Sequence, residues 1–164
     1  MFGNSSRHEA NGNATGSRTA DRDSAAPVVA LDTSALMAPV EANVRLFEEL
    51  DRLLGEYRAV VPAAVRAELD RLADGGGTEA AAANVGADLA QRADLIDTDA
   101  ANGTREESSG STNEYADDVL VALAERGAVE YVVTNDRTLT DRILARNVPV
   151  IGLRGQNALA IREP

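Results

Sequence analysis

Four acidic residues of this chain stand inside apolar segments, where a carboxylate without a partner is costly to bury. They are Asp32 in VVALDTSAL, Glu68 in VPAAVRAEL, Asp117 in YADDVLVAL and Asp136 in YVVTND. A divalent cation can hold several carboxylates together in one cleft. We therefore expect the four acids to share a metal site, with Asp118 as a further candidate ligand.

Carboxylate oxygens are hard ligands, so this set of acids predicts Mg²⁺ or Mn²⁺. Two such ions roughly 4 Å apart can activate water and stabilise the leaving oxygen of a phosphodiester. The chain has no cysteine, and its single histidine, His8, lies in a polar N-terminal stretch. Thiol nucleophiles are thus excluded, an imidazole-based triad is disfavoured, and metal-dependent phosphodiester hydrolysis with one or two ions is favoured.

Each acid also has a structural explanation. Asp32, followed by Thr33 and Ser34, suits a turn or a helix cap, although the two hydroxyls could also hold its carboxylate or a metal-bound water. Asp136 suits the N-cap of the helix that follows it. An acid in the first turn of a helix favours the helix dipole, which could account for Glu114.

Helical periodicity separates the inner acids from the outer ones. At about 100° per residue, Glu68 lies beside the apolar stripe formed by Val65, Leu69 and Leu72. Asp117 lies next to the stripe of its own helix, whereas Asp118 lies a further step toward solvent. Periodicity therefore favours Asp117 as the inner ligand and leaves Asp118 and Glu114 as outer candidates.

The elements that must position these acids alternate along the chain. Apolar, β-rich runs predict strands at 28–31, 57–61, 94–98, 130–134 and 148–153, with helical patterns between them. This order predicts a three-layer α/β/α fold with a central parallel sheet of about five strands. Ligands of such sheets bind at the carboxyl ends of the strands, where Asp32 and Asp136 are expected.

Composition divides the chain into two parts. Residues 1–26 lack apolar periodicity and predict a disordered polar tail, and residues 27–164 predict one domain. Residues 98–113 are polar and predict a loop that leads into the helix of Asp117. No apolar run approaches membrane-spanning length and no signal core is present, so we expect a soluble, cytoplasmic protein.

The charge balance is acidic and unusual in its basic residues. The formal net charge is −11, and all 16 basic residues are arginine. This pattern resembles proteins of salt-loving archaea. At molar salt the Debye length is roughly 3 Å, so the acidity does not exclude an RNA substrate. Candidate phosphate contacts are Arg137, Arg142 and Arg154.

From about Val28 to Ile161 the chain resembles the PIN domain, a metal-dependent ribonuclease fold. The resemblance is carried by LDTSALM, FEELDRLL, VVPAAVRAELDRLA, YADDVLVALAERG, VVTNDRTLTDRIL and VPVIGLR. It implies an endoribonuclease whose catalytic acids are Asp32, Glu68, Asp117 and Asp136. It further implies Mg²⁺ or Mn²⁺, pairing into a homodimer, and similarity to archaeal PIN nucleases that cleave precursor rRNA. The family often has Asn where Ser34 stands, which implies weaker hydrogen bonding around the ligands.

Other classes of protein share parts of this pattern. Haloacid-dehalogenase-like phosphatases need a second Asp at position 34 and a lysine, and receiver domains also need a lysine; both requirements fail here. A VapC-type toxin ribonuclease has the same fold and acids. A non-catalytic RNA-binding or scaffold module is the alternative from outside the enzymes, and the sequence leaves both of these open.

Overall fold

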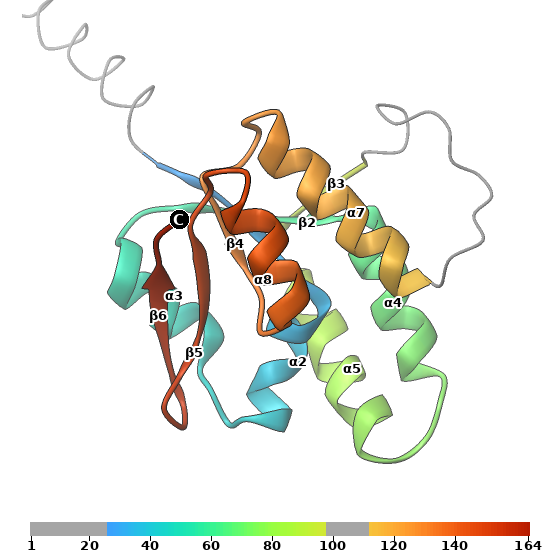
Figure 1. Cartoon of the computed structure of the whole chain (residues 1–164). Helices are drawn as coiled ribbons and strands as arrows, with labels where there is room; N and C mark the ends of the chain where they lie inside the picture. Colours follow the sequence, from blue (N-terminus) through green and yellow to red (C-terminus); the bar gives the residue numbers. More distant parts are fainter. Residues whose placement is uncertain (1–25, 98–111) are drawn as a thin grey trace, which may run out of the picture.

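A computed structural model of the chain describes residues 26–97 and 112–164, with side chains in the second range from residue 115 onward. Six strands form one sheet in the order β3-β2-β1-β4-β5-β6 (Figure 1). They are β1 (Val28–Leu31), β2 (Arg58–Pro62), β3 (Asp94–Ile96), β4 (Tyr131–Val133), β5 (Val150–Arg154) and β6 (Ala158–Arg162). The first five strands are parallel to one another, and β6 is antiparallel to β5.

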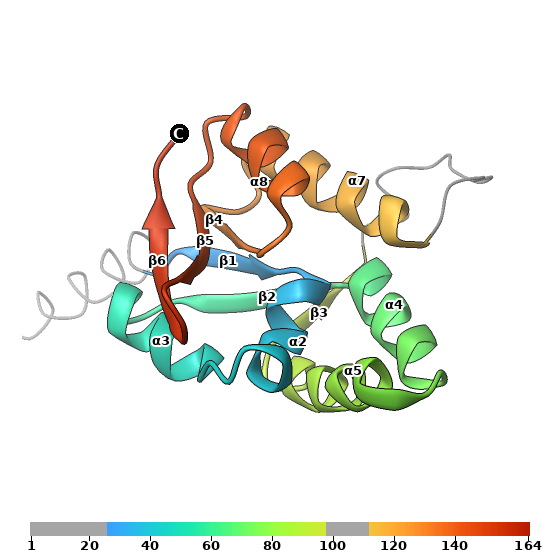
Figure 2. The same ribbon diagram turned by 60° about the horizontal axis from the view of Figure 1, so that its bottom comes forward.

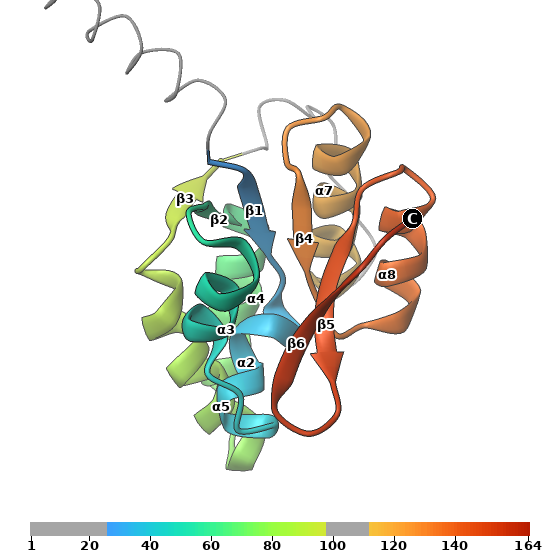
Figure 3. The same ribbon diagram turned by 90° about the vertical axis from the view of Figure 1, so that its left-hand side faces the viewer.

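Helices cover both faces of this sheet. They are α2 (Thr33–Glu41), α3 (Leu46–Leu54), α4 (Ala63–Ala73), α5 (Gly77–Ala90), α7 (Thr112–Glu125) and α8 (Arg137–Leu144). Figures 2 and 3 show α7 and α8 on one face of the sheet, with α2, α3 and α5 on the other. The predicted three-layer α/β/α fold is confirmed.

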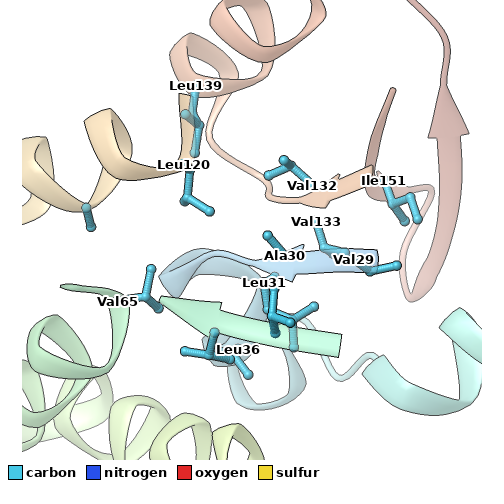
Figure 4. Close-up of a cluster of buried hydrophobic side chains, with 14 of the residues drawn as sticks. Val29, Ala30, Leu31, Leu36, Val65, Leu120, Val132, Val133, Leu139 and Ile151 are labelled. Carbon is cyan, nitrogen blue, oxygen red and sulfur yellow. The ribbon is translucent and has the colours of Figure 1, made fainter. Parts of the chain in front are cut away.

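The core lies on both sides of the sheet, as expected for parallel strands covered by helices. Figure 4 shows Leu120 of α7 and Leu139 of α8 reaching the strands from one side. Leu36 of α2 and Val65 of α4 reach them from the other side. All four side chains are fully buried. Because both faces are covered, the central strands appear in the sequence as continuous apolar runs.

The strand that the sequence did not predict is β6. Its sequence, ALAIR, is a short segment rich in alanine, which is not typical of strands. Long-range contacts with α3 hold this edge strand. The Leu159 amide donates to Glu49 Oε1 at 2.9 Å, and Arg52 Nη2 donates to the Leu159 carbonyl at 2.9 Å. These side chains occupy backbone groups that an edge strand would otherwise leave unpaired.

Local sequence explains two helix boundaries. Helix α3 ends before Gly55, whose φ of 75° is one that glycine adopts readily. Helix α4 begins one residue after Pro62, its N-cap. The predicted tail and its His8 lie outside the described residues, except for Ala26, and so does the loop predicted at 98–113, except for its last two residues. Within the described chain, no helix is both long and apolar enough to cross a membrane.

Candidate active site

The carboxyl ends of the central strands place two of the four acids. Asp32 follows β1 and Asp136 follows β4, and these two strands are neighbours in the sheet. The chain runs from β1 outward to β2 and β3, then returns to β4 on the other side of β1. The β1–β4 boundary is therefore the point where strand order reverses, and open α/β sheets bind ligands at such points.

Asp32 is buried, with an exposed fraction of 3%, and its carboxylate is held by two hydroxyl groups. Thr134 Oγ1 donates to Asp32 Oδ2 at 2.7 Å, and Ser34 Oγ donates to the same oxygen at 2.9 Å. Burial raises the pKa of Asp32, and these hydrogen bonds oppose the rise. Asp32 occupies the N-cap position of α2 without a capping bond from its side chain. Its carboxylate is therefore oriented by hydroxyls rather than used as a helix cap.

Glu68, on α4, is also buried, with an exposed fraction of 5%. Thr33 Oγ1 donates to Glu68 Oε1 at 3.0 Å, and Arg71 lies 4.0 Å from the other carboxylate oxygen. Burial raises the pKa of Glu68, and the charge of Asp32 adds to the rise. Of the two hydroxyls after Asp32, Ser34 thus holds Asp32 itself, whereas Thr33 reaches Glu68.

Asp117 connects the four acids electrostatically. Its pKa is raised to about 7, first by burial and then by the charges of Asp32, Asp136 and Glu68. Arg142 acts in the opposite direction. The three acting charges come from the carboxyl ends of β1 and β4 and from α4, so acids from separate elements act together on Asp117 of α7.

Asp136 has the capping role that we considered as its structural explanation. Its Oδ1 accepts from the Leu139 amide at 2.9 Å, which caps α8. Its own amide donates to Thr134 Oγ1 at 3.0 Å. The charge of Asp136 still acts on Asp117, so capping one amide does not remove it from the group of acids.

The structure does not bring Asp118 into this group. Its side chain is 64% exposed and lies 2.9 Å from Arg142 Nη2 in an ion pair. Arg142, which we considered for phosphate binding, is therefore already paired. Glu114 lies outside the described side chains.

Sequence reasoning missed two residues that organise the site. Thr134 is buried, with an exposed fraction of 1%, and is the donor closest to Asp32. The backbone amide of Asn135 donates to Ser34 Oγ at 2.9 Å and so fixes the turn after β4 against the start of α2. The available signal was a polar run, TND, directly after the buried strand YVV.

The donors in this group suit a hard divalent cation. Within the described residues, no three acidic or histidine side chains are already arranged as ligands of one ion. The chemistry of the four carboxylates nevertheless fits Mg²⁺ or Mn²⁺, because all the donors are oxygens and, after burial, the charges of the other three acids add to the raised pKa of Asp117. A divalent cation would remove the repulsion that opposes their closer approach.

The fold is a three-layer α/β/α domain, and acidic residues lie at the carboxyl ends of its neighbouring strands β1 and β4. The chain belongs to the PIN-like domain family, whose model matches residues 29–156. The resemblance predicted from the sequence motifs is therefore confirmed.

Two solved structures show the same fold. One is the PIN domain endonuclease Utp24, with a TM-score of 0.63 and 22% identity, over 84% of this chain and 92% of that chain. The other is a domain of a functionally unknown protein from Methanocaldococcus jannaschii, with a TM-score of 0.55 and 16% identity, over 79% and 93%. No curated protein matches.

Proposed function

We propose that this protein is an endoribonuclease that hydrolyses RNA phosphodiester bonds with Mg²⁺ or Mn²⁺. The observation that carries the proposal is the raised pKa of Asp117, about 7, to which the charges of Asp32, Asp136 and Glu68 all contribute. A fold of the PIN-like family and a likeness to a PIN domain endonuclease support the same activity.

In this proposal Asp32, Glu68, Asp117 and Asp136 hold the metal. When bound, the metal supplies activation of water and stabilisation of the leaving oxygen. The protein's contribution is to hold the carboxylates in fixed positions before the substrate arrives. Thr134 fixes Asp32 through a 2.7 Å hydrogen bond, and the burial of Asp32 and Glu68 strengthens electrostatic interactions at these carboxylates.

Two hydroxyl groups at the start of α2 each orient a different acid. Ser34 Oγ donates to Asp32 and accepts from the Asn135 amide, so it joins the β1 and β4 ends of the site. Thr33 Oγ1 donates to Glu68 and so joins α2 to α4. Both acids are thereby held against rotation.

The deciding experiment is cleavage of a labelled RNA at high salt, with Mn²⁺ or with EDTA. Wild type should cleave only with the metal, and Asp32→Asn and Asp117→Asn should each lose at least about 100-fold in rate, the scale of losing one electrostatic stabiliser. Asp70→Asn is the matched control, because Asp70 is exposed and pairs with Arg66 on the outer face of α4. Cleavage that survives both active-site substitutions would overturn the proposal.

We further propose precursor rRNA as the substrate and the cytoplasm of a salt-loving cell as the setting. Support comes from the sequence motifs similar to archaeal PIN nucleases and from the lysine-free, acidic composition. Mapping RNA crosslinked to the protein in cells tests the substrate, and growth arrest on expression alone would instead indicate a VapC-type toxin. The proposed homodimer is tested by sedimentation.

A further inference from the structure

A cavity of about 510 Å³ lies between α8 and the β5–β6 hairpin, and the residues on either side of Asp136 line it. Arginines line it from both sides, with Arg137 from α8 and Arg154 and Arg162 from the hairpin. The remaining wall includes Thr134 and Asn135 from the turn after β4. The residues that orient Asp32 and Ser34 therefore also form part of this cavity.

The strand register of the hairpin places Arg154 and Arg162 on the same face. Antiparallel pairing sets Arg154 opposite Ala158, Gly152 opposite Ala160, and Val150 opposite Arg162. Residues two apart on a strand face the same side, so these six side chains share one face. The small residues Gly152 and Ala160 lie in its middle, and the arginines lie at its two ends. A Cβ on Gly152 would lie only 2.9 Å from the Thr134 carbonyl oxygen, so the hairpin packs closely against the β4–α8 turn.

No ion pair within the described parts of the chain balances the charge of these arginines. None of Arg137, Arg154 and Arg162 forms an ion pair with any residue in the described parts of the chain, and all three are exposed. Six other arginines in the same parts do form ion pairs, namely Arg45, Arg52, Arg58, Arg66, Arg71 and Arg142. In a chain of net charge −11, three unpaired guanidinium groups around one cavity indicate a site for anions.

The position of the cavity relates it to the acids. Arg154 ends β5, which is parallel to β4, so it stands at the same edge of the sheet as Asp136. Asn135 connects the cavity with the acids. Its side-chain oxygen accepts from the Leu153 amide at 2.9 Å, and its backbone amide donates to Ser34 Oγ. A phosphodiester backbone bound at the acids can therefore extend into the cavity.

We propose that this cavity binds backbone phosphates of the single-stranded RNA segment next to the bond that is cut. The inference rests on the proposed function, which supplies RNA as the substrate. Guanidinium groups suit this role because they donate two parallel hydrogen bonds to a phosphate. The lining, as far as the structure describes it, contains no aromatic side chain for base stacking, so binding depends on the backbone and tolerates different sequences.

The test measures binding of a short fluorescent single-stranded RNA by anisotropy, with the full chain in EDTA and over a range of salt. The variants are Arg154→Gln/Arg162→Gln and, independently on α8, Arg137→Gln. The matched control is Arg126→Gln/Arg146→Gln, which removes the same charge from exposed arginines that precede β4 and β5 and do not line the cavity. Circular dichroism at each salt concentration verifies that every variant is folded.

Loss of two phosphate contacts should lower the slope of log affinity against log salt by about 1.4, at about 0.7 per contact on a single strand. Arg137→Gln should lower it by about 0.7. The control pair should keep the wild-type slope, and Arg154→Lys/Arg162→Lys should keep most of it because the charge remains. The same slope for the hairpin variants and the control pair, or no RNA binding by wild type, would overturn the cavity as a phosphate site.

Cleavage with Mn²⁺ separates this proposal from the nuclease proposal. If wild type cleaves and the hairpin variants bind and cleave as the control pair does, the cavity proposal fails and the nuclease stands. If wild type does not cleave but the hairpin variants lower the salt slope, the nuclease proposal fails and the RNA site stands. If both proposals are correct, the hairpin variants should need more RNA for half-maximal cleavage while the maximal rate is unchanged.

Discussion

Replacing Asp117 with asparagine should stabilise the protein in EDTA at neutral and higher pH. The pKa of Asp117 is raised from 3.8 to about 7, because burial and the charges of Asp32, Asp136 and Glu68 disfavour the ionised carboxylate. Asparagine has nearly the same shape and no charge, so the substitution removes this penalty. A residue proposed to act in catalysis would then be one whose replacement strengthens the fold.

The magnitude follows from the pKa. A change from 3.8 to about 7 corresponds to about 4 kcal/mol. Because Asp117 is only partly buried, solvent screening reduces the expected gain to about 1–2 kcal/mol. A raised pKa makes the folded protein bind the proton more tightly than the unfolded chain does. The penalty is therefore absent below about pH 4, grows as the pH rises toward about 7, and is constant above that.

Urea unfolding at pH 4 and pH 8, in EDTA and at one fixed salt concentration, measures this effect. Asp117→Asn should exceed wild type in free energy of unfolding by about 1–2 kcal/mol at pH 8 and by less than half of that at pH 4. The control Asp70→Asn removes an exposed ion pair with Arg66 and should change the stability by less than about 1 kcal/mol. A destabilised Asp117→Asn at pH 8, or an equal gain at both pH values, would refute the electrostatic coupling of the four acids.

Two further predictions concern the packing around the site. Thr134→Val removes the donor 2.7 Å from the buried Asp32 carboxylate, so it should lower the free energy of unfolding at pH 8 by about 1–3 kcal/mol; an unchanged urea midpoint would contradict this. Gly86→Ala places a Cβ 3.0 Å from the Leu36 carbonyl oxygen, where α5 packs against α2, and should cost about 1–3 kcal/mol. Gly75→Ala meets nothing closer than 3.4 Å and is its control; equal stability of the two variants would show that α5 and α2 are not closely packed.

Local patterns were sufficient for most of the fold. Five strands could be predicted. Four of them contain buried, continuous apolar runs, whereas β3 is largely exposed. Helical phase also placed Asp117 nearer the core than Asp118, and in the structure Asp117 is partly buried while Asp118 is exposed. These features depend on residues within a turn or two of one another, which a single sequence displays directly.

The features that escaped prediction depend on partners far away in the chain. The edge strand β6 is held by Glu49 and Arg52, which lie more than a hundred residues before Leu159. Thr134 likewise donates to Asp32 across 102 residues. Asp136 was correctly recognised as ambiguous, because the same carboxyl group both caps α8 and acts on Asp117. Only the tertiary structure reveals such contacts.

The most direct test of the central claim is RNA cleavage by Asp117→Asn in Mn²⁺, beside wild type and Asp70→Asn. This variant is expected to be at least as stable as metal-free wild type, so a loss of activity could not be attributed to unfolding. The account predicts that wild type and Asp70→Asn cleave, whereas Asp117→Asn is slower by at least about 100-fold. Cleavage by Asp117→Asn at the wild-type rate would contradict the account.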